Sequence, residues 1–364
     1  MHKFSFLILF LILMSTKIFS NANQYNDCKC PPTEPKTLDK YAYSCPEKTL
    51  NDRFYVFGEF LYMQAVEDSL DYAVLNRTRN VTQTAGSEVP DIIPGKRIGF
   101  KDNWNYEPGV RAGLGFLNYD LWNAELYWTY VDIDNSSTFH FTDLGVLIPL
   151  WSYPEDALNI QNSKDAKAFW NGSFNTLDFK IEKGFYLGEK FLFKPNIGIK
   201  AAWINQTYLI NMKIQWGAGD PFHDGEFDGN LEFRAVGMKT GLASEFHFLK
   251  YLYLYGEAGF SFLHSTFDLE EKIISFSTAE AEHILTQEFK FDTNLPVIEY
   301  IAGIGSDFSI REKIKVKLKI GYEMQTWFRQ NQFIRAFEQE ISVSEPASKD
   351  FSLSGLSFRL GFQF

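Results

Sequence analysis

The feature that most constrains the fold of this chain is a two-residue alternation of apolar and polar side chains. It is clear where Lys315, Lys317 and Lys319 alternate with aliphatic residues, and again over 356–364. A period of two places each set on its own face of a β-sheet. The alternating segments run roughly ten to fifteen residues, whereas strands of soluble domains usually have about five or six and tilted membrane-crossing strands need about 9–11. The pattern predicts an all-β, transmembrane, antiparallel up-and-down β-barrel.

The composition favours the same class. The chain has 36 Phe, 18 Tyr and 8 Trp, together 17% of its residues, which is more than a water-soluble core needs but is expected of a lipid-facing wall. Past the N-terminal segment, the longest apolar run is 144–151, which is too short for a spanning helix and contains Pro149. The net charge of −11 argues against a nucleic-acid partner, because phosphate binding needs a basic surface.

The spacing of the alternating segments predicts about ten strands. We expect these strands at 53–64, 106–116, 121–131, 174–186, 191–212, 229–248, 251–267, 295–308, 313–328 and 352–364. The connections alternate between short turns, expected on the periplasmic side, and long outer loops at 65–105, 132–173, 213–228, 268–294 and 329–351. Twelve strands also fit, because the loops 65–105 and 132–173 are each long enough to contain a hairpin.

The N-terminal segment predicts export. Lys3 precedes the apolar run Phe4–Met14, and small residues follow up to Ala22. This order is typical of a cleaved signal peptide. We therefore expect a signal peptide at 1–22, a periplasmic tail at 23–52, and a barrel at 53–364 in a bacterial outer membrane, in contact with its lipid.

Charged side chains on the polar faces of the predicted strands are expected to point into the lumen, because an Arg or Lys at mid-membrane on the lipid face costs about 2–4 kcal/mol. The pore-lining candidates are Glu59, Arg111, Glu125, Lys200, Glu257, Lys315, Lys317, Lys319 and Arg359. Arg234 is expected to face the lumen as well. Such charges either line a watery channel or pair across it. A barrel of this size predicts a narrow or partly obstructed channel, and the three lysines at 315–319 are expected to bias it locally toward anions.

The apolar run in the outer loop 132–173 predicts a constriction. Leu147, Ile148, Leu150 and Trp151 form an uncharged patch that a solvated loop has little reason to keep. We expect it to fold into the barrel mouth. Packing against another protomer of a homo-oligomer, or a small cluster beneath its own loop, remain alternatives.

Several segments resemble a known family. Phe54–Met63, Trp104–Phe116 and Asp120–Thr129 are similar to the opening strands of the pore-forming major-outer-membrane-protein-like family of Legionella and Chlamydia relatives. The resemblance implies an outer-membrane porin that passes small hydrophilic solutes passively, without catalytic residues or cofactors. The terminal Phe364, on an alternating strand, is similar to the signal read by the barrel-assembly machinery.

The cysteines Cys28, Cys30 and Cys45 all precede the first predicted strand. An oxidising compartment favours pairing, but Cys28 and Cys30 are too close in sequence to pair well, and one bridge to Cys45 leaves a thiol over. That leftover thiol either stays idle or links the chain to neighbouring envelope proteins, as the resemblance to cysteine-linked envelopes implies.

Two other function classes remain open. The first is a structural or adhesive surface barrel whose loops bind a partner. The second is an enzyme at the outer rim, for which His223 beside Asp224 would be half of a site. Neither a nucleophile elbow nor a metal-ligand spacing is visible in the sequence, so we expect no enzyme and no metal.

Overall fold

The computed structural model describes residues 53–76, 96–100, 104–118, 120–140, 146–151, 162–188, 190–215, 221–276, 282–311, 314–335, 345–346 and 349–364. The predicted signal peptide, the predicted tail and Cys28, Cys30 and Cys45 lie outside these residues, so the statements about them stay predictions. Within the described ranges, no helix is long and apolar enough to span a bilayer.

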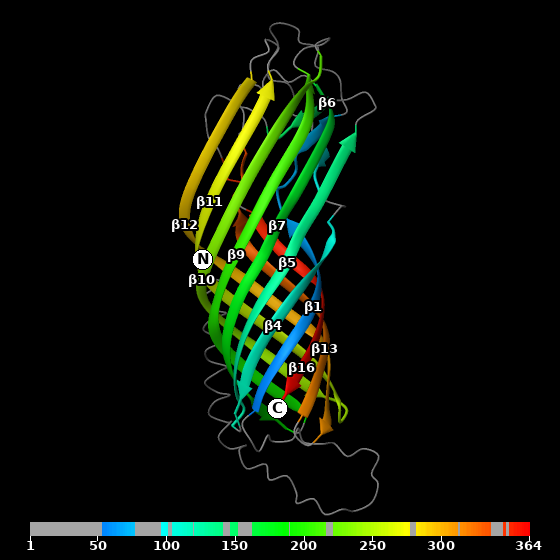
Figure 1. Cartoon of the computed structure of the whole chain (residues 1–364), viewed down its shortest axis with the longest axis vertical. Helices are drawn as coiled ribbons and strands as arrows, with labels where there is room; N and C mark the ends of the chain where they lie inside the picture. Colours follow the sequence, from blue (N-terminus) through cyan, green and yellow to red (C-terminus); the bar gives the residue numbers. More distant parts are fainter. Residues whose placement is uncertain are drawn as a thin grey trace, which may run out of the picture.

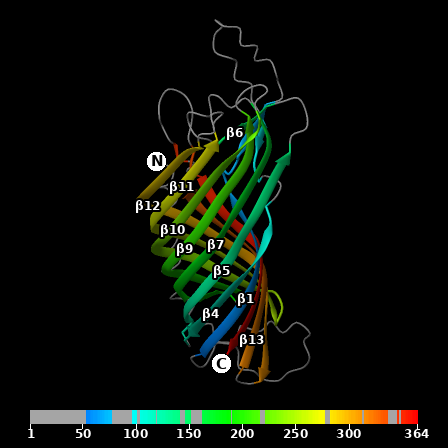
Figure 2. The same cartoon turned by 45° about the horizontal axis from the view of Figure 1, so that its top comes forward.

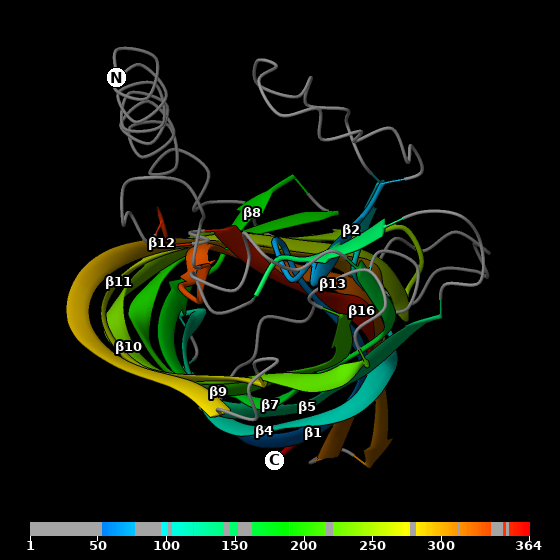
Figure 3. The ribbon, with the colours of Figure 1, turned by 90° about the horizontal axis from the view of Figure 1, so that it is seen from above.

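The described residues form a closed antiparallel barrel of ten strands (Figures 1 and 3). The barrel strands are β1 (Arg53–Glu67), β4 (Tyr106–Leu117), β5 (Trp122–His140), β7 (Asn162–Lys183), β9 (Phe191–Gln215), β10 (His223–His247), β11 (Leu252–Phe276), β12 (Glu282–Arg311), β13 (Ile314–Asn331) and β16 (Lys349–Gln363). Each strand pairs with its neighbour along the chain, and β16 pairs with β1 to complete the ring. The predicted fold class is confirmed.

Four short connections lie at one end of the barrel, which we call the short-turn end. They join β4 to β5, the short strand β8 (Phe185–Leu187) after β7 to β9, β10 to β11, and β12 to β13. In the turn before β9, Gly188 has φ +71°, a left-handed conformation that suits glycine. This end lies at the bottom of Figure 1, beside the C-terminus.

The strands are longer than the sequence pattern predicted. β9, β10 and β11 have 25 residues each and β12 has 30, whereas crossing a bilayer takes about 9–11. The predicted loops 213–228 and 268–294 are therefore wrong, since most of their described residues continue strands of the barrel wall. These strands rise above β1, β4, β13 and β16 at the long-loop end (Figures 1 and 2).

Smaller strands fill parts of the long connections. β2 (Ala73–Asn76), β3 (Lys96–Ile98) and β6 (Val146–Pro149) form a separate three-stranded sheet. β8 (Phe185–Leu187) continues β7 along β9, and β14 (Ile334–Arg335) pairs with β15 (Glu345–Pro346). Loops 65–105 and 132–173 do contain strands, but these strands pair with each other instead of widening the ring to twelve.

The outer face of the wall changes character along its height. On β9, Ile199 and Trp203 are exposed outward, but the next outward positions are Asn205 and Thr207. On β10, Val236 and Met238 give way to Glu232 and Arg234 in the same way. We call the apolar zone nearer the short-turn end the lipid belt, and the polar zone beyond it the extension.

One orientation prediction is wrong. Arg234 points outward, with 69% of its side chain exposed and an ion pair to Glu232, because it lies in the extension, where water surrounds the wall. Val316 lies on the outer face of β13 with Leu318 and Ile320, but only 4% of it is exposed. Its strand partners on either side are Phe308 and Phe362, whose bulk covers it.

The inner face changes in the opposite sense. Within the lipid belt it is charged, and in the extension it is largely apolar and forms one continuous core, in which a few polar side chains such as Glu67, Gln206 and Glu271 are also buried. Trp327 lies at the boundary: its ring stands 5.5 Å from that of Phe174 on the apolar side and 5.6 Å from the Nζ atom of Lys200 on the charged side. The barrel thus has a polar lumen where it meets lipid and a protein-like core where it projects beyond lipid.

Candidate functional site

The charged part of the lumen contains a cavity of about 770 Å³. It extends from the level of Arg111 and Glu323 down to Lys250 and Tyr251 at the short-turn end. The structure places every predicted pore-lining residue on its wall: Glu59, Arg111, Glu125, Lys200, Glu257, Lys315, Lys317, Lys319 and Arg359. Strand parity brings them to one face, and closure of the ring brings them around one space.

Arg111 and two carboxylates close the upper end of the cavity. The guanidinium donates to both carboxylate oxygens of Glu323, at 2.7 and 2.9 Å, and to Glu59 at 3.2 Å. Its Nε atom donates to the hydroxyl of Thr129 at 2.9 Å. These groups come from β4, β13, β1 and β5, so the bidentate pair connects strands that are far apart in the chain.

A second layer pairs two lysines with two acids. Lys200 contacts Asp178 at 3.0 Å and Glu299 at 2.7 Å, and Lys239 contacts the same two carboxylates at 2.9 and 2.6 Å. All four come from different strands, and the quartet is electrically balanced. It braces the wall directly below the apolar core.

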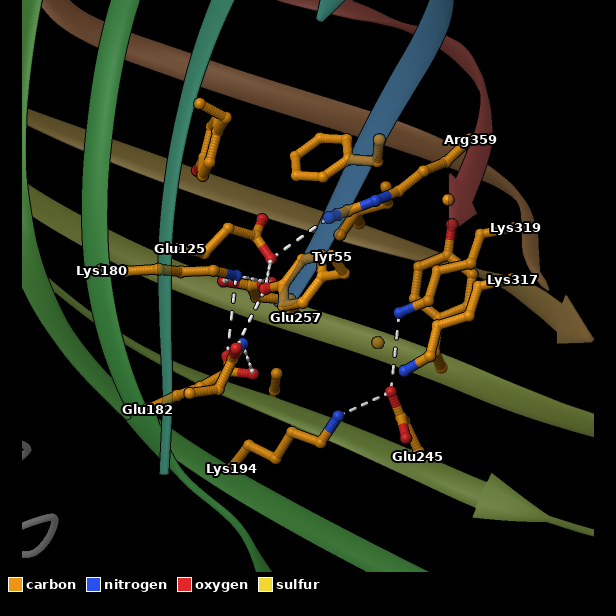
Figure 4. A pocket seen from close by; sticks show the side chains of 18 of the residues that line it. Tyr55, Glu125, Lys180, Glu182, Lys194, Glu245, Glu257, Lys317, Lys319 and Arg359 are labelled. Atoms are coloured by element: carbon orange, nitrogen blue, oxygen red, sulfur yellow. Dashed lines mark hydrogen bonds and ion pairs between the residues drawn. The ribbon is translucent and has the colours of Figure 1, made fainter. Parts of the chain in front are cut away.

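A third group lies across the middle of the cavity (Figure 4). Arg359 pairs with Glu125 at 3.2 Å, and the hydroxyl of Tyr55 donates to the same carboxylate at 2.7 Å. Lys180 contacts Glu257 at 3.0 Å and Glu182 at 3.7 Å. These pairs hold their charged groups against the wall.

The short-turn end of the cavity is basic. The carboxylate of Glu245 lies 2.7 Å from the ammonium group of Lys194, 3.5 Å from that of Lys319 and 3.7 Å from the Nε2 atom of His247. Lys317 contacts Asp307 only at 3.9 Å. Among the described residues, the charged side chains that line this end are the acids Glu182, Glu245 and Asp307 and, in greater number, the bases Lys194, Lys250, Lys315, Lys317 and Lys319.

Sequence reasoning missed part of the wall. Asp178, Lys239, Glu299 and Glu323 all lie within predicted strands and on the lumen face, in phase with the residues that were predicted. Extending the two-residue period along each strand would have found them.

The extension is filled by segments of the long loops. We call residues 68–76, 96–100 and 146–151 the plug. Leu147 is fully buried, and the ring of Trp151 packs 4.6 Å from Phe227 and 5.4 Å from Tyr208. Leu150 is partly buried against the same core, and the backbone of Ile148 pairs with Val74. The segment that was predicted to constrict the channel thus lies among the apolar side chains of the lumen.

Hydrogen bonds hold the plug together and fix it to the wall. Within the plug, the indole of Trp151 donates to the carbonyl of Asp71 at 2.8 Å. From the wall, the hydroxyl of Tyr208 donates to the carbonyl of Leu70 at 2.8 Å. The hydroxyls of Tyr72 and Ser137 lie 3.1 Å apart, and burial raises the pKa of Tyr72. The plug therefore combines apolar packing with satisfied polar groups.

Of the two rim residues considered for catalysis, Asp224 forms an ion pair with Lys213 at 3.0 Å. Among the residues that the structure describes, no group of three or more His, Cys, Asp or Glu side chains is arranged to hold a metal ion.

A model of the family described as Legionella pneumophila major outer membrane protein precursor matches residues 45–364. The chain belongs to this family. The predicted resemblance is confirmed, and the outer membrane is the location of the barrel. No curated protein matches the chain.

Solved structures with similar folds are distant in sequence. The outer membrane protease OmpT from Escherichia coli is 9% identical, with a TM-score of 0.41, over 86% of this chain and 97% of that chain. A mutant of the TodX monoaromatic hydrocarbon channel is 8% identical, with a TM-score of 0.33, over 86% and 90% of the two chains. The CymD monoaromatic hydrocarbon channel is 7% identical, with a TM-score of 0.33, over 87% and 89%.

Proposed function

We propose that this outer-membrane barrel is a pore for passive diffusion of small hydrophilic solutes. The observation that carries the proposal is the 770 Å³ cavity within the lipid belt, surrounded by charged side chains. A lumen that served only stability would gain from packed side chains, because desolvating ion pairs brings little net stability. A charged, roomy lumen instead favours water and polar solutes. The proposal assigns no catalysis and no cofactor to the chain.

The plug acts in this proposal as a gate at the long-loop end. It fills the apolar part of the lumen with Leu147 and Trp151, and a hydrophilic solute cannot cross such a core while the plug stays in place. Transport therefore requires the plug to move or to loosen. Its attachment through hydrogen bonds and side-chain packing, and its position in loop segments, are compatible with such movement.

Insertion of the purified protein into a planar bilayer tests the pore. We expect stepwise conductance, reduced in Gly361→Phe, because Gly361 lines the cavity and an added Cβ there meets only ordinary contacts at 3.6 Å or more. Gly58→Phe is the matched control, since Gly58 lies on the outer face with nothing within 4 Å of an added Cβ. Equal conductance in both folded variants would contradict passage through this cavity.

A structural or adhesive surface barrel is the second candidate. It is favoured by the extension, whose polar outer face projects beyond the lipid belt around an apolar core. Partners for such a role include envelope proteins bound through the predicted tail or further copies of the chain. A folded protein that stays silent in the bilayer, with the plug loosened as well, would favour this candidate over the pore.

A further inference from the structure

The short-turn end of the cavity holds more positive charge than its acids balance. Three ammonium groups, from Lys194, Lys317 and Lys319, point toward the carboxylate of Glu245 (Figure 4). They come from β9 and β13, on opposite sides of the cavity. Lys250 and Lys315 line the same end.

The acids nearby are already engaged. Glu245 has a lysine at 2.7 Å, and Asp307 accepts a hydrogen bond of 3.0 Å from the hydroxyl of Tyr253. Lys317, by contrast, approaches Asp307 only to 3.9 Å and keeps 38% of its side chain exposed to the cavity. A further anion would therefore meet a lysine that is available and a local field that is positive.

The lysines are also held in place. Lys319 lies over the ring of Tyr255 at 4.7 Å and near that of Tyr253 at 5.7 Å. Lys194 is 20% exposed and fixed by Glu245. Fixed and partly desolvated ammonium groups bind an oxyanion more strongly than solvated ones, because less water screens them and less side-chain freedom is lost.

We propose that Lys194, Lys317 and Lys319 form a binding site for a phosphate group, with Glu245 as the internal anion that such a ligand competes with. The excess of positive over negative side chains at this end favours a dianion over a monoanion. The role of this site in the cell rests on the proposed function, because it would collect phosphate-bearing solutes at the short-turn end of the pore. The site itself can be tested without transport.

The site is tested by calorimetry at low salt, which measures the binding of inorganic phosphate to the detergent-solubilised full-length barrel. We expect Lys317→Gln to weaken binding by roughly ten-fold, because it removes one charge-assisted contact. Glu245→Gln is expected to strengthen binding several-fold, because it removes the competing carboxylate. Lys290→Gln is the matched control, since Lys290 pairs with Asp268 on the outer face at 69% exposure, and it should bind as the unchanged protein does.

Two results would overturn the site. One is equal phosphate affinity in Lys317→Gln and Lys290→Gln. The other is loss of affinity in a folded Glu245→Gln variant, which would make Glu245 a structural support. If Glu245→Gln does not fold, as judged by heat-modifiable migration, the Lys317 comparison decides alone, because the substitution of Lys317 removes a long ion pair to Asp307, at 3.9 Å. If the barrel binds phosphate but does not conduct, the pore is contradicted and the phosphate site stands. If the barrel conducts but does not bind phosphate, the site is contradicted and the pore stands.

Discussion

Arg111 shows how a single residue holds distant strands together. Its guanidinium is buried between Glu59 and Glu323, with side-chain exposures of 10%, 3% and 8%. The cross-strand pairing of Glu59 with Arg111 follows from the register of β1 and β4, but Glu323 reaches the same group from β13, which is two strands beyond β1 in the ring. Removing the arginine leaves two buried carboxylates close together without a cation.

We expect Arg111→Met to lower the free energy of unfolding by about 3–5 kcal/mol, the usual cost of breaking a buried ion pair from one side. Arg234→Met is the control, because the Arg234–Glu232 pair is exposed on the outer face and is worth about 0–1 kcal/mol. Urea titration of both variants in lipid vesicles measures the difference. Similar losses in the two would mean that the Arg111 cluster does not stabilise the barrel.

The residue scale also shows what the sequence could and could not predict. The two-residue period placed Glu59, Lys200 and Arg359 on the lumen face, because parity alone decides the side of a strand. It could not pair Lys200 with Asp178 and Glu299, since the height at which two strands meet depends on register and tilt around the closed ring. The faces were therefore predictable, and the ion-pair partners were not.

At the scale of elements, the apolar run in the loop after β5 was found, but its contacts were not. A charge-free segment ending in Trp151 predicts burial. Its pairing with β2, from a different loop, depends on where the barrel brings the two loops together. The strand lengths were underestimated for a related reason: in the extension the apolar residues face inward and the polar ones outward, so the alternation continues but changes phase relative to the lipid belt.

Loosening the plug should open the pore. We expect the double variant Leu147→Ser and Trp151→Ser to raise single-channel conductance several-fold, because it removes the apolar packing that Leu147 and Trp151 make inside the lumen. Lys96→Ser, at an exposed position of β3, is the control within the same sheet. Unaltered conductance in a correctly inserted double variant would place the barrier elsewhere.

At the scale of the whole molecule, the barrel consists of two zones with opposite polarity. In the lipid belt the outer face is apolar and the lumen is charged, as the membrane and the aqueous cavity require. In the extension the outer face is polar and the interior is packed like that of a soluble protein. Both zones use the same continuous strands, so the change must lie in the side chains, and on β9 it falls between Trp203 and Asn205.

This boundary can be measured with one substitution made at two heights on the same face of β9. Ile199 is 53% exposed in the lipid belt, and Asn205 is exposed in the extension. An arginine in the hydrocarbon interior costs about 2–4 kcal/mol, and one near or beyond the interface costs about 0–1 kcal/mol.

We therefore expect Ile199→Arg to lower the free energy of unfolding in vesicles by several times more than Asn205→Arg does. Denaturant titration of both variants measures the two losses. The register leaves both positions in regular pairing with β10, opposite Met238 and Glu232, so strand geometry is matched and lipid contact is what differs. Equal losses would mean that the bilayer covers the extension as well, in which case its outward carboxylates would have to be solvated inside the membrane.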